Sequence, residues 1–206
     1  MMTQTGPGSF IHRYDPGRDE SRRPLLLLHG TGGNEDDLVD LGQTVSPGSA
    51  LLSPRGKVSE NGMPRFFRRL AEGVFDEEDV KFRANELADF VAESRLAYGL
   101  DTPMAFGFSN GANIAAALLL LRPEALAGAV LLRAMVPLRQ MPSPDLSGKR
   151  ILMLSGAMDP IIPAANAAML AEHLKACGAD VTYRNLPASH GLTQADLRHS
   201  AEFLAL

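Results

Sequence analysis

The stretch from Met104 to Leu121 constrains the fold of this chain more than any other part of it. An apolar run, Met104–Phe108, is typical of a buried strand, and it leads through Gly-Phe-Ser-Asn-Gly into an almost wholly apolar helical pattern over residues 112–121. A strand, a tight turn and a helix in this order form the setting of a nucleophile elbow, in which glycines leave room for the sharp turn. The pattern therefore predicts that Ser109 has a strained backbone and that its hydroxyl is raised at the N-terminus of a helix.

Short apolar runs alternate with helical patterns along the rest of the chain. The run Leu25–Leu28 is too short for a helix and is apolar throughout, as in a strand buried on both faces. Further strands are expected at Phe10–Tyr14 (an edge), Ala50–Ser53, Ala129–Leu132, Ile151–Ser155 and Val181–Leu186, and further helices from Asn34, around Val80–Val91 up to a stop at Gly99, and at Ala164–Ala176 and Thr193–Leu204. The alternation predicts one α/β domain over residues 1–206, with a mostly parallel twisted sheet flanked by helices and no cap domain.

Composition excludes several other classes of protein. A chain of 206 residues, 45% of them hydrophobic, is expected to be an ordinary soluble domain. The net charge of −4, with no Lys/Arg run longer than two, argues against binding to nucleic acid or to an anionic membrane. The single cysteine, Cys177, fits a reducing compartment. Because the N-terminus lacks signal-peptide features and the longest apolar run, Ile114–Leu121, is too short to span a bilayer, a cytoplasmic protein is expected.

Reactive side chains follow four of the expected strands. Ser109, Asp159 and His190 each follow a strand, as does the glycine-rich segment His29–Gly33. Ligands of open parallel sheets bind outside the carboxyl ends of the strands, so these residues are expected to meet. Their order along the chain, Ser then Asp then His, is the order of the α/β-hydrolase triad.

Each residue type suits a step of acyl transfer. A serine hydroxyl is a weak nucleophile, so His190 would take the proton of Ser109 as a general base. The carboxylate of Asp159 would orient His190 and stabilise the imidazolium. Backbone N–H groups would hold the oxyanion, and the best candidates are Asn110, directly after the serine, and Thr31 in the glycine-rich segment.

Structural alternatives remain open for these residues. Asp159-Pro160 is also an ordinary turn sequence, and His29 is expected to pack under the glycine-rich segment rather than to act as the base, since it precedes the serine. The acidic run 35–37 is explained by capping of a helix that begins at Asn34, so no metal site is expected there. The joint agreement of residue type, order and strand-end placement favours the triad.

The motifs together resemble the phospholipase/carboxylesterase family of α/β hydrolases, which includes the acyl-protein thioesterases. The resemblance covers the chain from about residue 10 to the end and rests on residues 28–33, 107–113, 159–160 and 190–191. Within the family, the segments Ser-Asn-Gly-Ala-Asn and Arg55…Arg65-Phe66-Phe67 are similar to those of small bacterial carboxylesterases that include hydroquinone-responsive hydrolases. The resemblance implies a Ser-Asp-His esterase without a cofactor, and a homodimer.

The expected function is the hydrolysis of small to medium, uncharged or aromatic carboxylic esters. The long segment 54–75 would form one wall of the site, with Phe66 or Phe67 in contact with the substrate. Alternatives are an acyl thioesterase or lysophospholipase, and a non-catalytic ligand-binding protein with the hydrolase fold. The thioesterase branch usually has Gln after the serine and Leu in the glycine-rich loop, where this chain has Asn110 and Thr31, which disfavours deacylation of lipidated proteins.

Overall fold

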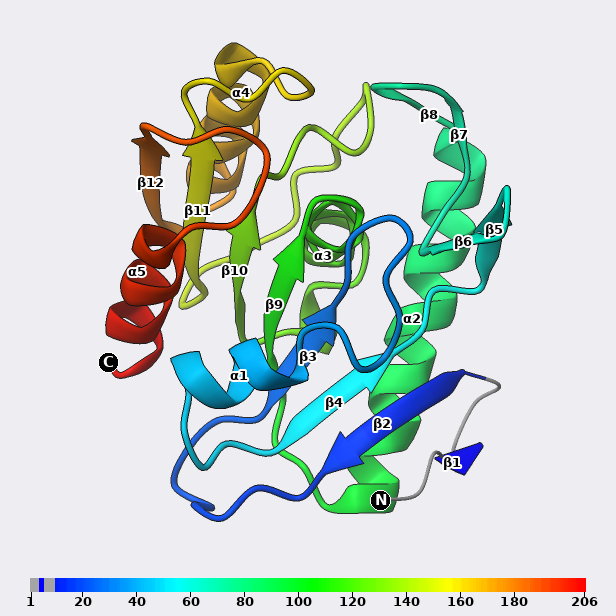
Figure 1. The fold of residues 1–206 in the computed structure, drawn as a ribbon, viewed down its shortest axis with the longest axis vertical. Coiled ribbons are helices and arrows are strands. Elements are labelled where there is room, and N and C mark those ends of the chain that lie inside the picture. The colour runs from blue at the N-terminus through cyan, green and yellow to red at the C-terminus, as the bar shows by residue number, and fades with distance from the viewer. Residues whose placement is uncertain (1–3, 6–9) are drawn as a thin grey trace.

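An eight-stranded sheet forms the centre of the structure, a computed structural model that describes residues 4–5 and 10–206 (Figure 1). The other N-terminal residues, part of the segment in which no signal peptide is expected, lie outside the described residues. The strands of this sheet are β1 (Gln4–Thr5), β2 (Ile11–Asp15), β3 (Leu25–Leu28), β4 (Leu51–Pro54), β9 (Met104–Phe108), β10 (Gly128–Leu132), β11 (Arg150–Gly156) and β12 (Asp180–Leu186). The helices are α1 (Val39–Val45), α2 (Glu77–Tyr98), α3 (Asn110–Leu121), α4 (Ala164–Ala176) and α5 (Gln194–Leu204), with a short 3-10 turn η1 (Pro123–Ala125).

The strand order is β1-β2-β4-β3-β9-β10-β11-β12. In this order, every neighbouring pair from β4 to β12 is parallel. The pairs β1–β2 and β2–β4 are antiparallel. The mostly parallel sheet predicted from the sequence is therefore confirmed. The strand expected at Phe10–Tyr14 exists as β2, but it is not the edge, because β1 pairs with its outer side.

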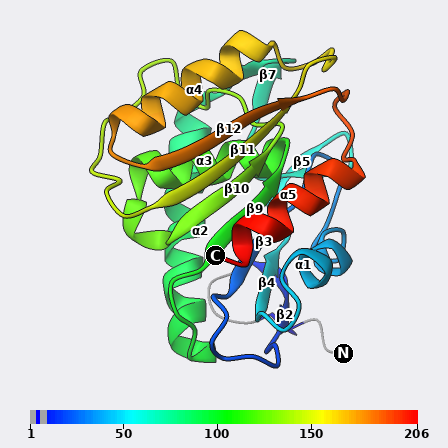
Figure 2. The same cartoon turned by 90° about the vertical axis from the view of Figure 1, so that its left-hand side faces the viewer.

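Helices cover both faces of the sheet, as Figure 2 shows. Helices α2, α3 and α4 lie on one face, where the side chains of α3 and of β9 and β10 form the larger buried core. Helices α1 and α5 lie on the other face and bury a second apolar cluster that includes Leu25, Phe106 and Phe203. Burial on both faces explains why the central strands are apolar runs rather than alternating sequences.

Two of the predicted helix ends are observed with the expected chemistry. Gly99 ends α2 in the left-handed conformation (φ 65°), which suits a residue without a Cβ. Thr193 caps α5 through a capping box with Asp196.

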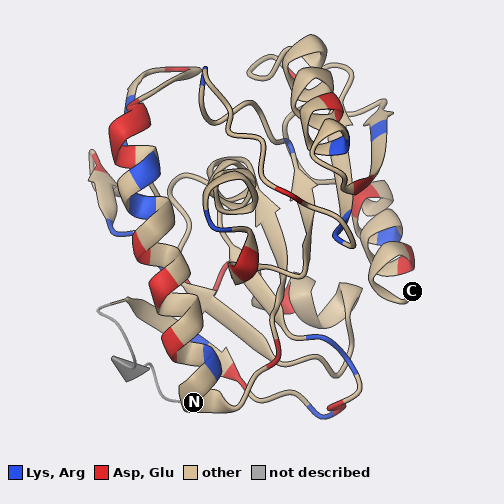
Figure 3. Ribbon diagram, turned by 180° about the vertical axis from the view of Figure 1, so that it is seen from behind, with Lys and Arg blue, Asp and Glu red and all other residues tan. Residues whose placement is uncertain are grey.

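Helix α2 has both acidic and basic side chains along its length (Figure 3). Within the described part of the chain, every helix is too short or too polar to cross a lipid bilayer.

The prediction that a helix begins at Asn34 is wrong, because α1 begins only at Val39. The Asn34 side chain instead accepts a hydrogen bond from the backbone N–H of Asp36, which makes a local turn. Glu35 is buried and forms an ion pair with Arg55 (Nη2–Oε1 2.7 Å) rather than capping a helix. A long-range partner thus decided the structure of a segment that local propensity assigned to a helix.

The segment between β4 and α2 folds into two small hairpins beside the carboxyl edge of the sheet. Strands β5 (Val58–Glu60) and β6 (Met63–Arg65) form the first, and β7 (Arg69–Ala71) and β8 (Val74–Phe75) form the second. The paired backbone of these hairpins gives their side chains fixed positions.

Candidate active site

Ser109 lies at the turn between β9 and α3 and has a positive φ of 52°, the strained conformation that the sequence predicts. A Cβ on Gly111 would come within 1.9 Å of the carbonyl oxygen of Leu28, and one on Gly107 within 2.6 Å of the carbonyl oxygen of Gly111. Any larger residue would push the helix away from the neighbouring strands. The two glycines of the motif are therefore required by the close packing of the turn, which fixes where Ser109 stands.

A continuous chain of hydrogen bonds joins the three predicted triad residues. His190 Nε2 lies 3.0 Å from Ser109 Oγ, and His190 Nδ1 lies 2.8 Å from Asp159 Oδ2. Because a carboxylate can only accept, the Nδ1 of the neutral ring carries the proton and Nε2 is free to accept that of the serine. The three side chains come from loops after β9, β11 and β12, so the parallel sheet brings them together.

Asp159 is held so that it stays ionised. Its side chain is 1% exposed, and its Oδ1 accepts hydrogen bonds from the backbone N–H groups of Ile161 and Ile162. Burial opposes ionisation, but these bonds and that from His190 together hold the pKa of Asp159 below its ordinary value. The carboxylate is therefore available to orient the imidazole throughout the neutral range.

The two candidate oxyanion donors, Thr31 and Asn110, line the same pocket as Ser109. Among the described residues, neither backbone N–H has a hydrogen-bond acceptor. The glycine-rich loop is held in place by a bond from Gly32 N–H to the carbonyl of Pro64 and by one from Arg65 Nη1 to Thr31 Oγ1 (2.6 Å). Two free N–H groups on fixed backbone are what a developing oxyanion requires.

His29 has the structural role that the sequence favours for it. Its side chain is buried, its Nδ1 donates to the carbonyl of Gly30 (2.6 Å), and its Nε2 accepts from the N–H of Gly56 (3.0 Å). Burial lowers the pKa of His29, so the ring is neutral near pH 7. Both ring nitrogens are used in joining the glycine-rich loop to the 55–57 segment, and neither contacts Ser109.

The pocket in front of Ser109 has a volume of about 260 Å³. Its apolar walls come from Phe75, Phe108, Met135, Ile161 and Ile162, and its polar lining from Thr31, Arg65, Arg69, Glu72, Ser109, Asn110, Asn113 and His190. The predicted contact of Phe66 and Phe67 with substrate is contradicted, since these side chains are 3% and 0% exposed and do not line the pocket. They pack in the core because their own segment folds back onto α2 and α3. Phe75, two hairpin strands further on, takes the place expected for them.

The asparagines of the elbow fix the walls of this pocket. Asn110 Oδ1 accepts from the N–H of Phe66 (2.7 Å), and Asn113 Oδ1 accepts from the N–H of Met135 (2.9 Å). Both asparagines are buried, so each amide side chain supports one loop from the first turn of α3. The Ser-Asn-Gly-Ala-Asn sequence thus ties the nucleophile to the loops that surround it.

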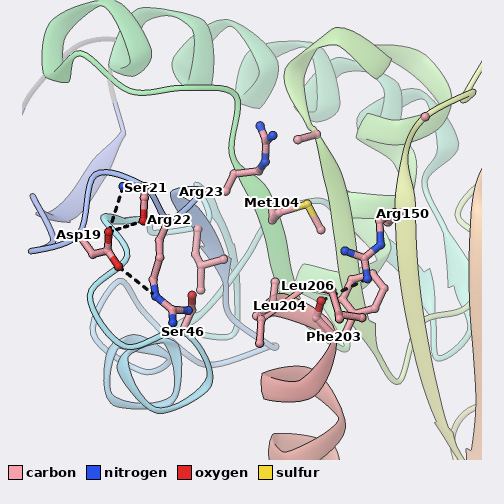
Figure 4. A pocket seen from close by; sticks show the side chains of 14 residues that line it. Asp19, Ser21, Arg22, Arg23, Ser46, Met104, Arg150, Phe203, Leu204 and Leu206 are labelled. Carbon is pink, nitrogen blue, oxygen red and sulfur yellow. Dashed lines mark hydrogen bonds and ion pairs between the residues drawn. The ribbon is translucent and has the colours of Figure 1, made fainter.

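A larger cavity of about 550 Å³ lies at the opposite edge of the sheet (Figure 4). It is lined by residues at the amino ends of the strands, including Leu25, Met104 and Arg150. Its polar groups are largely satisfied internally: Asp19 bonds Ser21 and Arg22, and Arg150 Nη2 donates to the carbonyl of Phe203. It contains none of the triad residues, so the smaller pocket is the candidate active site. No group of His, Cys, Asp or Glu side chains within the described ranges is arranged to hold a metal ion.

Arg133 is a residue of the site that the sequence analysis missed. It follows β10, is fully buried, and forms a two-pronged ion pair with Asp196 (2.7 and 2.8 Å). Its guanidinium also donates to the carbonyls of Ser189 and Gly191, the two neighbours of His190, at 3.0 Å each. Arg133 therefore holds the loop that carries His190 through hydrogen bonds on both sides of the histidine. Nothing in the sequence pairs these residues, because their contact depends on the fold alone.

Replacing Arg133 with methionine is expected to lower the free energy of unfolding by about 3–5 kcal/mol, because Asp196 would remain as a buried charge without its partner. The measurement is urea unfolding followed by circular dichroism. Arg139→Met is the matched control, since Arg139 is 92% exposed in its ion pair with Glu77 and its loss should cost about 1 kcal/mol or less. Equal losses in the two variants would contradict a structural role for the buried pair.

Comparison with known proteins finds a matching family model and similar hydrolases and carboxylesterases. The Phospholipase/Carboxylesterase family model matches residues 13–206. MhqD of Bacillus subtilis (strain 168), which is named as a hydrolase, is 42% identical over 194 residues, covering 93% of this chain and 96% of that protein. The crystal structure of the Bacillus cereus carboxylesterase is 45% identical, with a TM-score of 0.94 over 97% of this chain and 95% of that one. A carboxylesterase from Mesorhizobium loti is 32% identical, with a TM-score of 0.93 over 99% and 98% of the two chains.

Proposed function

Because this chain belongs to the phospholipase/carboxylesterase family and has the α/β-hydrolase fold, as its sequence predicts, we propose that it is a serine carboxylesterase. The observation that carries the proposal is the hydrogen-bond chain from Asp159 through His190 to Ser109 at a strained elbow. A solvated serine on a glycine-rich turn would need none of these partners. The complete set of hydrogen bonds from Asp159 to Ser109 also disfavours the alternative of a non-catalytic ligand-binding protein.

In the proposed reaction, Ser109 Oγ attacks the ester carbonyl while His190 Nε2 accepts its proton. The oxyanion is held by the backbone N–H groups of Thr31 and Asn110, and Asp159 stabilises the imidazolium. Collapse of the tetrahedral intermediate breaks the bond to the alcohol, which leaves with the proton from His190. Water, deprotonated by His190, then attacks the acyl-serine and releases the carboxylic acid and Ser109.

The site needs no cofactor for this reaction, and a cytoplasmic location is proposed with it. The single cysteine supports that location, since it fits a reducing compartment. A homodimer is proposed on the family resemblance alone. Size-exclusion chromatography with light scattering measures the oligomeric state directly.

A short acyl preference is expected from the small pocket. A volume of about 260 Å³ has room for few methylenes, and each one contributes at most about 0.8 kcal/mol, only while it touches protein. We expect kcat/KM to peak at about two to six acyl carbons. The measurement is a series of p-nitrophenyl esters beside matched thioesters. A steady rise to palmitoyl, or a preference for thioesters, would favour the acyl thioesterase or lysophospholipase alternative instead.

A further inference from the structure

Two arginines lie in the pocket of the proposed esterase and have no role in the triad. Arg65 ends β6 and is 3% exposed, and Arg69 begins β7 and is 29% exposed. Both line the pocket together with Ser109 and His190. A buried arginine in a small esterase pocket is costly unless something there compensates its charge.

One carboxylate serves both arginines. Glu60 lies 3.2 Å from Arg65 Nε and 2.9 Å from Arg69 Nε, so this group of three keeps an excess of one positive charge. Burial, together with the charge of Arg69, lowers the pKa of Arg65. The other acid in the lining, Glu72, is exposed on the pocket rim, where solvent screens it. Arg65 and Arg69 are therefore the cationic side chains that line the pocket, beside the N-terminus of α3, while the ionised Asp159 is 1% exposed and does not line it.

The same pocket has more donors than the protein uses. Arg65 donates through Nε and Nη1, but Nη2 has no acceptor among the described residues. Arg69 donates only through Nε to described residues, which leaves both of its terminal nitrogens. The unused donors are therefore on two planar guanidinium groups, which fit the oxygens of a carboxylate.

We propose that the esterase acts on small esters that carry a carboxylate, which Arg65 and Arg69 bind in the pocket beside the oxyanion loop. This inference rests on the proposed function and names the substrate class of the same site. It replaces the uncharged substrates that the sequence analysis expects, because the sequence does not show which arginines face Ser109. The carboxylate could belong to the acyl part or to the alcohol part of the ester, and the test separates the two.

The test compares two pairs of substrates that differ only in charge. Monomethyl succinate and methyl succinamate place a carboxylate or an amide on the acyl side, and 4-acetoxybenzoate and 4-acetoxybenzamide do so on the alcohol side. We expect kcat/KM to be about tenfold or more higher for the carboxylate in at least one pair, the range of a charge-assisted hydrogen bond. The pair that shows the preference identifies the side, and added salt should weaken the preference.

Arg69→Gln is expected to reduce the ratio of carboxylate to amide turnover by about tenfold, mainly through KM. Arg65→Gln should reduce the ratio in the same way, provided that its circular dichroism spectrum matches that of the wild type. If the Arg65 variant does not fold, Arg69→Gln still tests the inference, because Arg69 is partly exposed. Arg198→Gln is the matched control, because Arg198 is exposed on α5 outside the pocket, and it should leave the ratio unchanged.

The outcomes separate this inference from the proposed function. Equal turnover of carboxylate and amide in both pairs, or a ratio that Arg69→Gln does not change, overturns the substrate class and leaves the esterase standing. Absence of turnover for every ester, including neutral p-nitrophenyl acetate, overturns the proposed function and this inference with it.

Discussion

Replacing Ser109 with alanine is expected to abolish ester hydrolysis, with a loss of about 10⁴-fold or more in kcat. Without the Oγ no acyl-enzyme can form, and the oxyanion donors alone give little rate. The fold should remain, because alanine has the same positive-φ strain as serine and removes only one hydroxyl contact, that to His190. The measurement is hydrolysis of p-nitrophenyl acetate together with circular dichroism.

Covalent labelling checks the same assignment independently. A fluorophosphonate should modify the wild type at Ser109 and leave the alanine variant unlabelled. Ser147→Ala serves as the control, since Ser147 is exposed at a loop remote from the pocket and should keep full activity. A folded Ser109→Ala protein that retains more than a few per cent of the turnover would rule out Ser109 as the nucleophile.

Replacing His190 with alanine is expected to cost about as much as the loss of the serine, because the members of a triad act as a unit. Asp159→Asn should be milder, since it keeps the geometry and removes only the charge. His199→Ala is the matched control on α5 outside the pocket, where the largely buried ring hydrogen-bonds to Glu202. If His29→Ala removed activity and His190→Ala did not, the assignment of the base would be wrong.

Asp159 is not expected to limit activity in mild acid, because hydrogen bonds hold its pKa below the ordinary value and keep the carboxylate that orients His190 ionised. Stability has its own dependence through His29, whose pKa burial lowers in the folded state. Below about pH 6.5 the unfolded chain then binds more protons than the folded one, so stability falls as the pH is lowered. Circular dichroism over the same range separates inactivation from unfolding.

The sequence by itself determined the architecture and the position of the chemistry. Apolar runs such as Leu25–Leu28 can only be strands buried on both faces, and strands of that kind require helices on both sides. Gly107 and Gly111 stand where the turn has no room for a Cβ, so the elbow could be predicted from this pentapeptide together with the strand and helix patterns on either side of it. The parallel sheet then places every strand-end residue at one edge, which is why Ser109, Asp159 and His190 meet although they are far apart in the chain.

Only the tertiary structure decided which side chains surround that chemistry. Phe66 and Phe67 follow Arg65 in sequence and are of the same type as Phe75. Phe66 and Phe67 nevertheless pack in the core, whereas Arg65 and Phe75 line the pocket. Glu35 pairs with Arg55 rather than capping a helix, and Arg133 reaches Asp196 from a distant strand. These choices depend on long-range ion pairs and on how hairpins fold back. Local patterns cannot specify such contacts, because the partners are far apart in the sequence and come close only once the sheet has formed.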